Sequence, residues 1–148
     1  MLVRAAPALT LGLALLLGGC VVPARSAGHY RDDATAAVQS AQSEAQTVAL
    51  VLAQVDRRRV TDQAAEVVVS EAEDAIAPLE ASFGSVQPPS PALDPVRAAV
   101  MTALGDADDA IAAARIALRR DDAAGRAAAA GQLRQVLGEL AGLSERLS

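Results

Sequence analysis

The chain has very few aromatic, cysteine and histidine residues. Its 148 residues include one Tyr, one Phe, one His, one Cys and no Trp. Aromatic side chains form much of the lining of apolar ligand pockets and dominate binding hot spots. We therefore expect no sizeable enclosed pocket for a small molecule. The single Cys also has no partner for an intramolecular disulfide.

The chain also lacks the residues on which most enzymes depend. It contains no Lys, and its one histidine, His29, precedes the first predicted helix. Nucleophilic catalysis needs a base beside the nucleophile, and a di-iron site in a helical bundle needs Glu-x-x-His pairs on facing helices. We expect no enzymatic activity, no catalytic residues, no metal and no other cofactor.

Carboxylates are frequent but poorly spaced for binding a metal ion. Ca²⁺ takes six or more oxygen ligands, usually from a loop that folds around the ion. Helical carboxylates at mixed spacings cannot enclose an ion in this way, so they predict a solvated acidic surface. The residues concerned are Glu66, Glu71, Glu73, Asp74, Asp106, Asp108 and Asp109.

Acidic residues outnumber basic ones, and the net charge is −5. All 18 acidic residues and 12 of the 13 basic residues follow Cys20, so this part has a net charge of −6. An acidic domain argues against binding to nucleic acid and against a polybasic membrane-surface role.

The N-terminal segment has the features of an export signal. Arg4 gives the first residues a positive charge, and Ala5–Leu17 is apolar. About 13 apolar residues are too few to span a bilayer core of roughly 30 Å as a helix. The next residues, Leu17-Gly18-Gly19-Cys20, resemble the lipobox of bacterial lipoproteins. The resemblance implies cleavage between Gly19 and Cys20 and a diacylglyceryl group on the Cys20 sulfur.

This resemblance predicts the organisation and location of the protein. Residues 1–19 would be a signal peptide, 20–31 a lipidated tether, and 32–148 a helical domain. Two acyl chains provide stable anchoring, here to the extracytoplasmic face of the cell membrane. An ordinary secretory signal, with Cys20 incidental, is the alternative. The 36 alanines and the segment Phe83–Pro89 also resemble alanine-rich lipoproteins of high-GC actinobacteria, a resemblance that implies no activity.

The domain shows four segments with helical periodicity. Asp32-Asp33 is a candidate N-cap for the first helix, which is predicted to end near Arg57–Arg59. The second begins at Thr61 or Asp62, and Pro78 should kink it or end it early. Apolar residues recur at alternating spacings of three and four. These seams are Val38, Ala41, Ala45, Val48, Leu52 and Val55, then Ala65, Val69, Ala72, Ile76, Leu79 and Phe83.

A Pro-rich linker at 84–95 separates the second helix from the third. Asp94-Pro95 predicts a helix start, Arg119-Arg120 a helix end, and Asp121-Asp122 the cap of the fourth helix. The seams of this pair are Val96, Val100, Ala103, Ala107, Ile111, Ala114 and Leu118, then Leu133, Val136, Leu140, Leu143 and Leu147.

These four segments predict an all-α, antiparallel up-down-up-down four-helix bundle. The alternative is a long helical hairpin in which the first two helices are continuous, since no Gly or Pro separates them. Extending the first seam past Val55 would bring in Arg59, Asp62 and Glu66, which favours two separate helices.

The arginine clusters are the strongest candidate for a functional surface. In a bundle of this topology Arg57, Arg58, Arg59, Arg119 and Arg120 would share one tip, farthest from the membrane. Grouped guanidinium groups suit carboxylates or phosphates on a partner. The alternative is that they only complement helix C-termini and pair with Asp62, Asp121 and Asp122.

The valines of the second helix offer a different contact surface. Val67, Val68 and Val69 are consecutive, so one or two of them must point away from the main seam. They either widen the core-facing stripe or contact a partner helix.

The predicted function is a membrane-anchored cell-envelope lipoprotein that acts as a non-catalytic protein-interaction or scaffold module. Its expected partners are the membrane, through the lipid, and an envelope protein. The alternative is an extracytoplasmic ligand-binding or sensory accessory of a transporter or sensor kinase.

Overall fold

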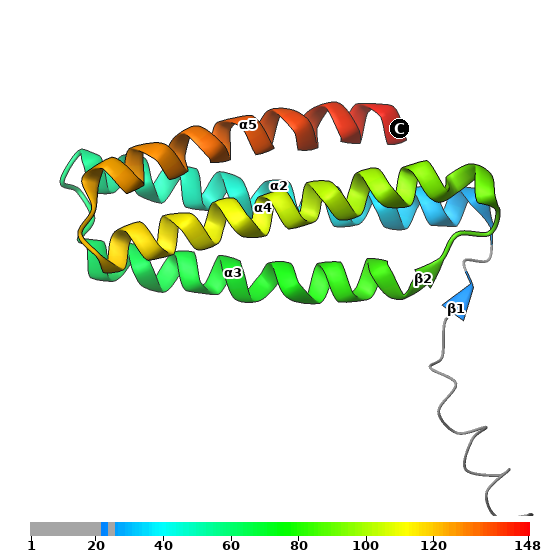
Figure 1. Cartoon of the computed structure of the whole chain (residues 1–148), viewed down its shortest axis with the longest axis horizontal. Coiled ribbons are helices and arrows are strands. Elements are labelled where there is room, and N and C mark those ends of the chain that lie inside the picture. The colour runs from blue at the N-terminus through cyan, green and yellow to red at the C-terminus, as the bar shows by residue number, and fades with distance from the viewer. Residues whose placement is uncertain (1–21, 24–25) are drawn as a thin grey trace, which may run out of the picture.

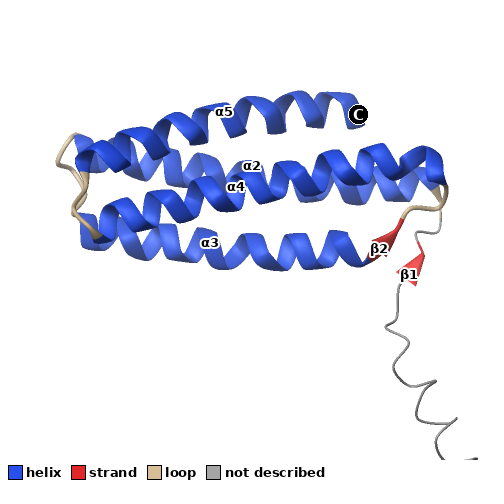
Figure 2. Cartoon of the chain, in the orientation of Figure 1, coloured by secondary structure: helices blue, strands red, loops and turns tan. Residues whose placement is uncertain are grey.

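The computed structural model describes residues 22–23 and 26–148. The predicted signal peptide, the lipobox residues Leu17, Gly18 and Gly19, and the predicted lipid attachment at Cys20 lie outside this range. Four long helices make up the body: α2 (Ala27–Asp56), α3 (Asp62–Ser85), α4 (Asp94–Arg119) and α5 (Ala123–Leu147) (Figures 1 and 2). The short elements are β1 (Val22–Pro23), β2 (Val86–Gln87) and the 3-10 helix η2 (Pro91–Leu93).

The helices form an antiparallel four-helix bundle. Each helix packs against the next in sequence, α5 packs back against α2, and α2 also contacts α4 across the centre. The all-α up-down-up-down prediction is confirmed. A turn at residues 57–61 separates α2 from α3, which excludes the continuous hairpin.

The core is built from the predicted seams. Every seam residue of the first and fourth helices is buried, and only Leu79 and Val96 of the other two seams are partly exposed. Alanine occupies many central positions without any exposed surface, among them Ala41, Ala45 and Ala107. Side chains this small allow the distance between helix axes to lie at the short end of the usual range of about 8–10 Å.

The first helix begins earlier than the sequence predicts. Residues 27–31, assigned to the tether, form the first turns of α2. The Ser26 hydroxyl accepts a hydrogen bond from the His29 backbone N–H, so Ser26 is the N-cap in place of Asp32-Asp33. Tyr30 is fully buried against Phe83, with ring centroids 5.4 Å apart. Burial of this ring extends the packed part of α2 beyond the predicted start.

The prediction for Pro78 is wrong in one respect, because α3 does not end there but continues to Ser85. Pro78 has no N–H to donate to the carbonyl of Asp74. Both residues are exposed, so water can serve that carbonyl. The linker is correspondingly shorter than predicted, at residues 86–93 in place of 84–95.

The start of α4 also differs from the prediction. Its N-cap position is Leu93, and no side chain caps it. Asp94 lies inside the first turn, where its negative charge complements the helix dipole.

The end of the bundle that holds the N-terminus of α2 also holds the linker. β1 pairs with β2 in parallel, with Val22 opposite Val86 and Pro23 opposite Gln87. The Arg97 guanidinium donates to the carbonyl of Gly84 at 2.5 Å, which satisfies a free acceptor at the end of α3. We call this the proximal end.

Candidate functional site

The two helix-connecting turns with arginines lie together at the end opposite β1 and β2 (Figure 1). They are residues 57–61, between α2 and α3, and residues 120–122, between α4 and α5. We call this the distal end. The 30 residues of α2 correspond to about 45 Å at 1.5 Å per residue. The topology thus brings the two predicted arginine groups to one end of the molecule.

Both turns have the same backbone form. The chain leaves each helix through a residue in the left-handed region, Arg58 with φ 57° and Asp121 with φ 49°. The backbone N–H of Arg59 donates to Gln54 O, and that of Asp122 to Ala117 O, each at 2.9 Å. These bonds are those of a Schellman motif, in which the left-handed residue is usually glycine. The next helices are capped by Thr61, where α3 was predicted to begin at Thr61 or Asp62, and by Asp122, as predicted.

The ion pairs of the distal end differ from those the sequence suggested. Asp62 and Asp121 both face Arg126 of α5, with Arg126 Nη1 3.7 Å from Asp62 Oδ2 and 3.4 Å from Asp121 Oδ1. Asp122 caps α5 through the Gly125 backbone N–H. Sequence reasoning did not identify Arg126; its contact with Asp121, five positions away, was open to a local pattern, but its contact with Asp62, 64 positions away, was not.

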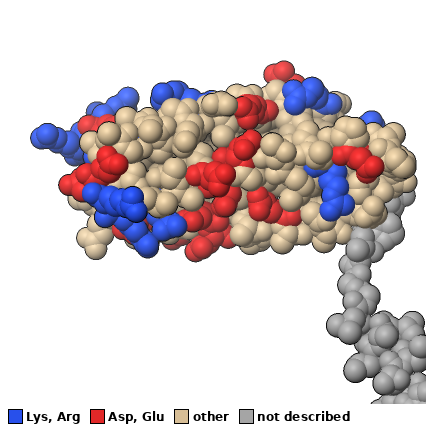
Figure 3. All heavy atoms as spheres, viewed as in Figure 1, with Lys and Arg blue, Asp and Glu red and all other residues tan. Residues whose placement is uncertain are grey.

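The five predicted arginines therefore divide into two groups. Arg119 pairs with Glu66 on α3. Within residues 26–148, the other four form no ion pair, and their side chains are exposed. They are Arg57, Arg58, Arg59 and Arg120. Figure 3 shows arginine side chains gathered at this end of the molecule.

A hollow lies beneath the first of these turns. It has a volume of about 540 Å³, and Arg58, Arg59 and Arg126 line it together with Asp56 and Asp62. The Arg126 side chain is only 12% exposed, and its Nε has no hydrogen-bond partner among the described residues. The two carboxylates offset most of the charge of the three guanidinium groups.

Exposed apolar side chains also gather toward the distal end. The large hydrophobic residues most exposed in the described part of the chain are Leu50 at 63%, Val67 at 56% and Ile116 at 41%. Each lies within six residues of the distal end of its helix, about 9 Å along the axis. Of the three consecutive valines, Val69 is buried, Val68 partly buried and Val67 exposed, as the helical spacing predicted.

A band of carboxylates crosses the middle of the bundle (Figure 3). Burial, with the nearby charges of Asp108 and Asp109, raises the pKa of Glu80. Burial, with the charges of Glu73 and Asp109, likewise raises the pKa of Asp108. Glu73 has a cationic partner, Arg115, which holds it through two hydrogen bonds. Like charges thus face each other across α3 and α4.

The carboxylate band does not have the arrangement of a metal centre. In the described part of the chain, no group of three or more His, Cys, Asp or Glu side chains is placed to hold a metal ion. None of the helices described here combines the length and apolar character needed to cross a membrane.

The chain was compared with protein-family models, with curated proteins and with solved structures, and none of these comparisons gave a significant match.

Proposed function

We propose that this chain is a membrane-anchored, non-catalytic lipoprotein of the cell envelope, and that its bundle is an interaction module whose distal end contacts an envelope protein. The lipobox at Leu17–Cys20 supports the anchor. The composition supports the absence of catalysis, since nucleophile and base pairs are lacking.

The position of the anchor relative to the bundle supports a role for the distal end. One residue separates Cys20 from β1 in the sequence, and β1 lies at the proximal end. A lipid on Cys20 would therefore hold the proximal end near the bilayer. The distal end would be presented about 45 Å away, the length of a 30-residue helix.

The observation that most favours this function is the composition of the distal end. It combines the exposed Arg57, Arg58, Arg59 and Arg120, which have no ion pair in the described structure, with the exposed apolar residues of α2, α3 and α4 nearby. Arginine is enriched at protein interfaces, where it contributes both guanidinium hydrogen bonds and apolar contact. Free guanidinium groups favour a partner with exposed carboxylates or phosphates.

The test is in-cell crosslinking of a tagged protein followed by mass spectrometry. The test variant replaces Arg57, Arg59 and Arg120 with Gln. Arg119 is left intact because it pairs with Glu66. The control variant replaces Arg31, Arg134 and Arg146, which are also exposed and outside the ion pairs described, so both variants lose three positive charges.

We expect one envelope protein to be recovered with the wild type and the control variant, and to be lost with the distal variant. Equal recovery with all three proteins would contradict a role for the distal end. Thermal stabilisation by a small anion such as phosphate, lost in the distal variant and without any protein neighbour, would contradict the scaffold function. That result would favour a ligand-binding accessory.

A further inference from the structure

We propose that the groove between α4 and α5 is a second docking surface, and that it binds a helical segment of a partner with a small apolar stripe flanked by Lys or Arg. The proposal rests on the described bundle alone and requires neither the lipid anchor nor the distal arginines.

The groove consists of two adjoining hollows between neighbouring helices. One hollow, of about 520 Å³, is lined by residues 106–116 of α4 and 132–139 of α5. A second, of about 350 Å³, is lined by residues 98–106 of α4 and 139–146 of α5. Asp106 and Glu139 line both hollows, so the two adjoin. The 19 residues from Ala98 to Ile116 span about 27 Å along the helix axis. A partner helix of five turns has this length.

Small side chains explain why the groove is open. On the α4 side its floor is formed by alanines, including Ala103, Ala110 and Ala113. On the α5 side the floor is formed by Val136 and Leu143. An apolar floor between two helices resembles the groove into which the side chains of a third helix pack. A helix satisfies its own backbone hydrogen bonds, whereas an extended peptide would leave its backbone groups without partners there.

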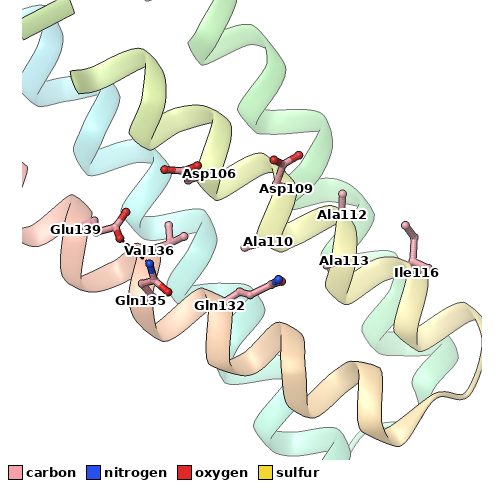
Figure 4. A pocket seen from close by; sticks show the side chains of 10 residues that line it. All are labelled: Asp106, Asp109, Ala110, Ala112, Ala113, Ile116, Gln132, Gln135, Val136 and Glu139. Atoms are coloured by element: carbon pink, nitrogen blue, oxygen red, sulfur yellow. Dashed lines mark hydrogen bonds between the residues drawn. The ribbon is translucent and has the colours of Figure 1, made fainter. Parts of the chain in front are cut away.

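The rim of the groove determines the charge of its occupant. Asp106 projects from α4 toward the side where Glu139 projects from α5, whereas Asp109, which also lines the first hollow, points away from α5 (Figure 4). Gln135 Nε2 donates to Glu139 Oε1 at 3.0 Å, and none of the three carboxylates has an ion-pair partner within residues 26–148.

The neighbouring carboxylates add to this negative field. Asp109 also lies close enough to Glu80 and Asp108 to raise the pKa of both. Arg115 is engaged with Glu73 on the α3 side. Among the residues that line the two hollows, Arg146, at the proximal end, is the one cation. Cations on a bound helix would complement the rim and relieve the repulsion between the carboxylates.

The test measures binding of a designed peptide to the chain from residue 20 onward, with Cys20→Ser. This chain contains the whole bundle, since the core extends from Tyr30 to Leu147. The probe is a labelled helical peptide of about 18 residues, with alanine and leucine on one face and lysine on both flanks. A second peptide carries glutamate in place of every lysine. Binding is followed by fluorescence anisotropy at low salt.

Two variants distinguish the groove from the general acidity of the protein. The groove variant is Asp106→Asn, Asp109→Asn and Glu139→Gln. The control variant is Asp32→Asn, Asp33→Asn and Glu71→Gln, which removes three exposed carboxylates from α2 and α3. Both variants change the net charge by the same amount.

We expect the lysine peptide to bind the wild type and the control variant with similar affinity. Its affinity for the groove variant should be on the order of tenfold weaker, as for the loss of three exposed ion pairs. The glutamate peptide should not bind. Equal weakening in both variants, or equal binding of both peptides, would overturn the proposal.

Two further results would assign the groove to a different occupant and also overturn the proposal. The first is stabilisation by calcium chloride alone that is lost in the groove variant, which would indicate a hard cation. The second is self-association of the free protein that is lost in the same variant, which would indicate a second copy of this chain. We expect replacement of the distal arginines to leave the binding of both peptides unchanged. Failure of this proposal and failure of the proposed function are therefore distinguishable.

Discussion

The Tyr30 hydroxyl should destabilise the folded protein. Tyr30 is fully buried near the proximal end, and its ring packs against Phe83. Its Oη has no hydrogen-bond partner among the described residues and is shielded from solvent. Burial raises the pKa of this phenol above 10.0, and the positive charge of Arg97 only partly opposes the increase. The variant Tyr30→Phe removes the hydroxyl and keeps the ring.

The size of the effect follows from desolvation. A buried hydroxyl without a hydrogen bond costs about 1–3 kcal/mol, because the unfolded state keeps it hydrated. Tyr30→Phe retains the aromatic pair, so we expect the free energy of unfolding to rise by about 1 kcal/mol. For a domain of this size the increase raises Tm by roughly 4 °C.

The assay is thermal unfolding followed by circular dichroism, with Tyr30→Ala as the control. Removing the ring should cost about 3–5 kcal/mol through lost packing. Alkaline absorbance titration gives an independent measurement, because the chain has only one Tyr. In the folded protein, tyrosinate should form at a pH above the ordinary value of 10.0.

A fall in Tm for Tyr30→Phe, by several degrees, would refute this reasoning. It would mean that the hydroxyl forms a favourable hydrogen bond in the folded protein. A titration at or below the ordinary tyrosine pKa would refute the burial of the phenol itself.

Two further predictions concern the distal turn and the acidic band. Arg58→Gly should stabilise the protein by about 1 kcal/mol in urea unfolding, because Arg58 has φ 57°, where glycine has no Cβ penalty. Unchanged or lower stability would show that contacts of the arginine outweigh its backbone strain. Tm should rise as the pH falls from about 7.5 to 5, since the raised pKa values of Glu80 and Asp108 make the folded state bind more protons than the unfolded state. The increase in Tm should be smaller in Glu80→Gln. A steady fall in Tm over this pH range would contradict the repulsion between these carboxylates.

The core of the bundle could be predicted from the sequence because its cause is local. Alternating spacings of three and four place Val48 and Leu52 on one face of α2, and Ile111 on the corresponding face of α4, and all three are buried. The caps at Thr61 and Asp122 are equally local, since each depends on a side chain three residues from its partner. These signals established four separate helices and hence the position of both arginine turns.

The features that were missed depend on tertiary contacts. The early start of α2 reflects the packing of Tyr30 on Phe83, which lies 53 positions later in the chain. The choice of Arg126 as the partner of Asp62 depends on how α3 and α5 are rotated about their axes. The α4–α5 groove depends in the same way on which alanines face the gap between two helices. A single sequence has no signal for these rotations.

The central claim is that the distal end, presented away from a lipid anchor, contacts an envelope protein. Its most direct test is a photocrosslinking amino acid placed at Gln63, near the distal end, or at Gln87, at the proximal end. Both glutamines are exposed. The account predicts an adduct with one envelope protein from position 63, none with that protein from position 87, and loss of the adduct in Cys20→Ala. The same adduct from both positions, or from position 63 without Cys20, would contradict it.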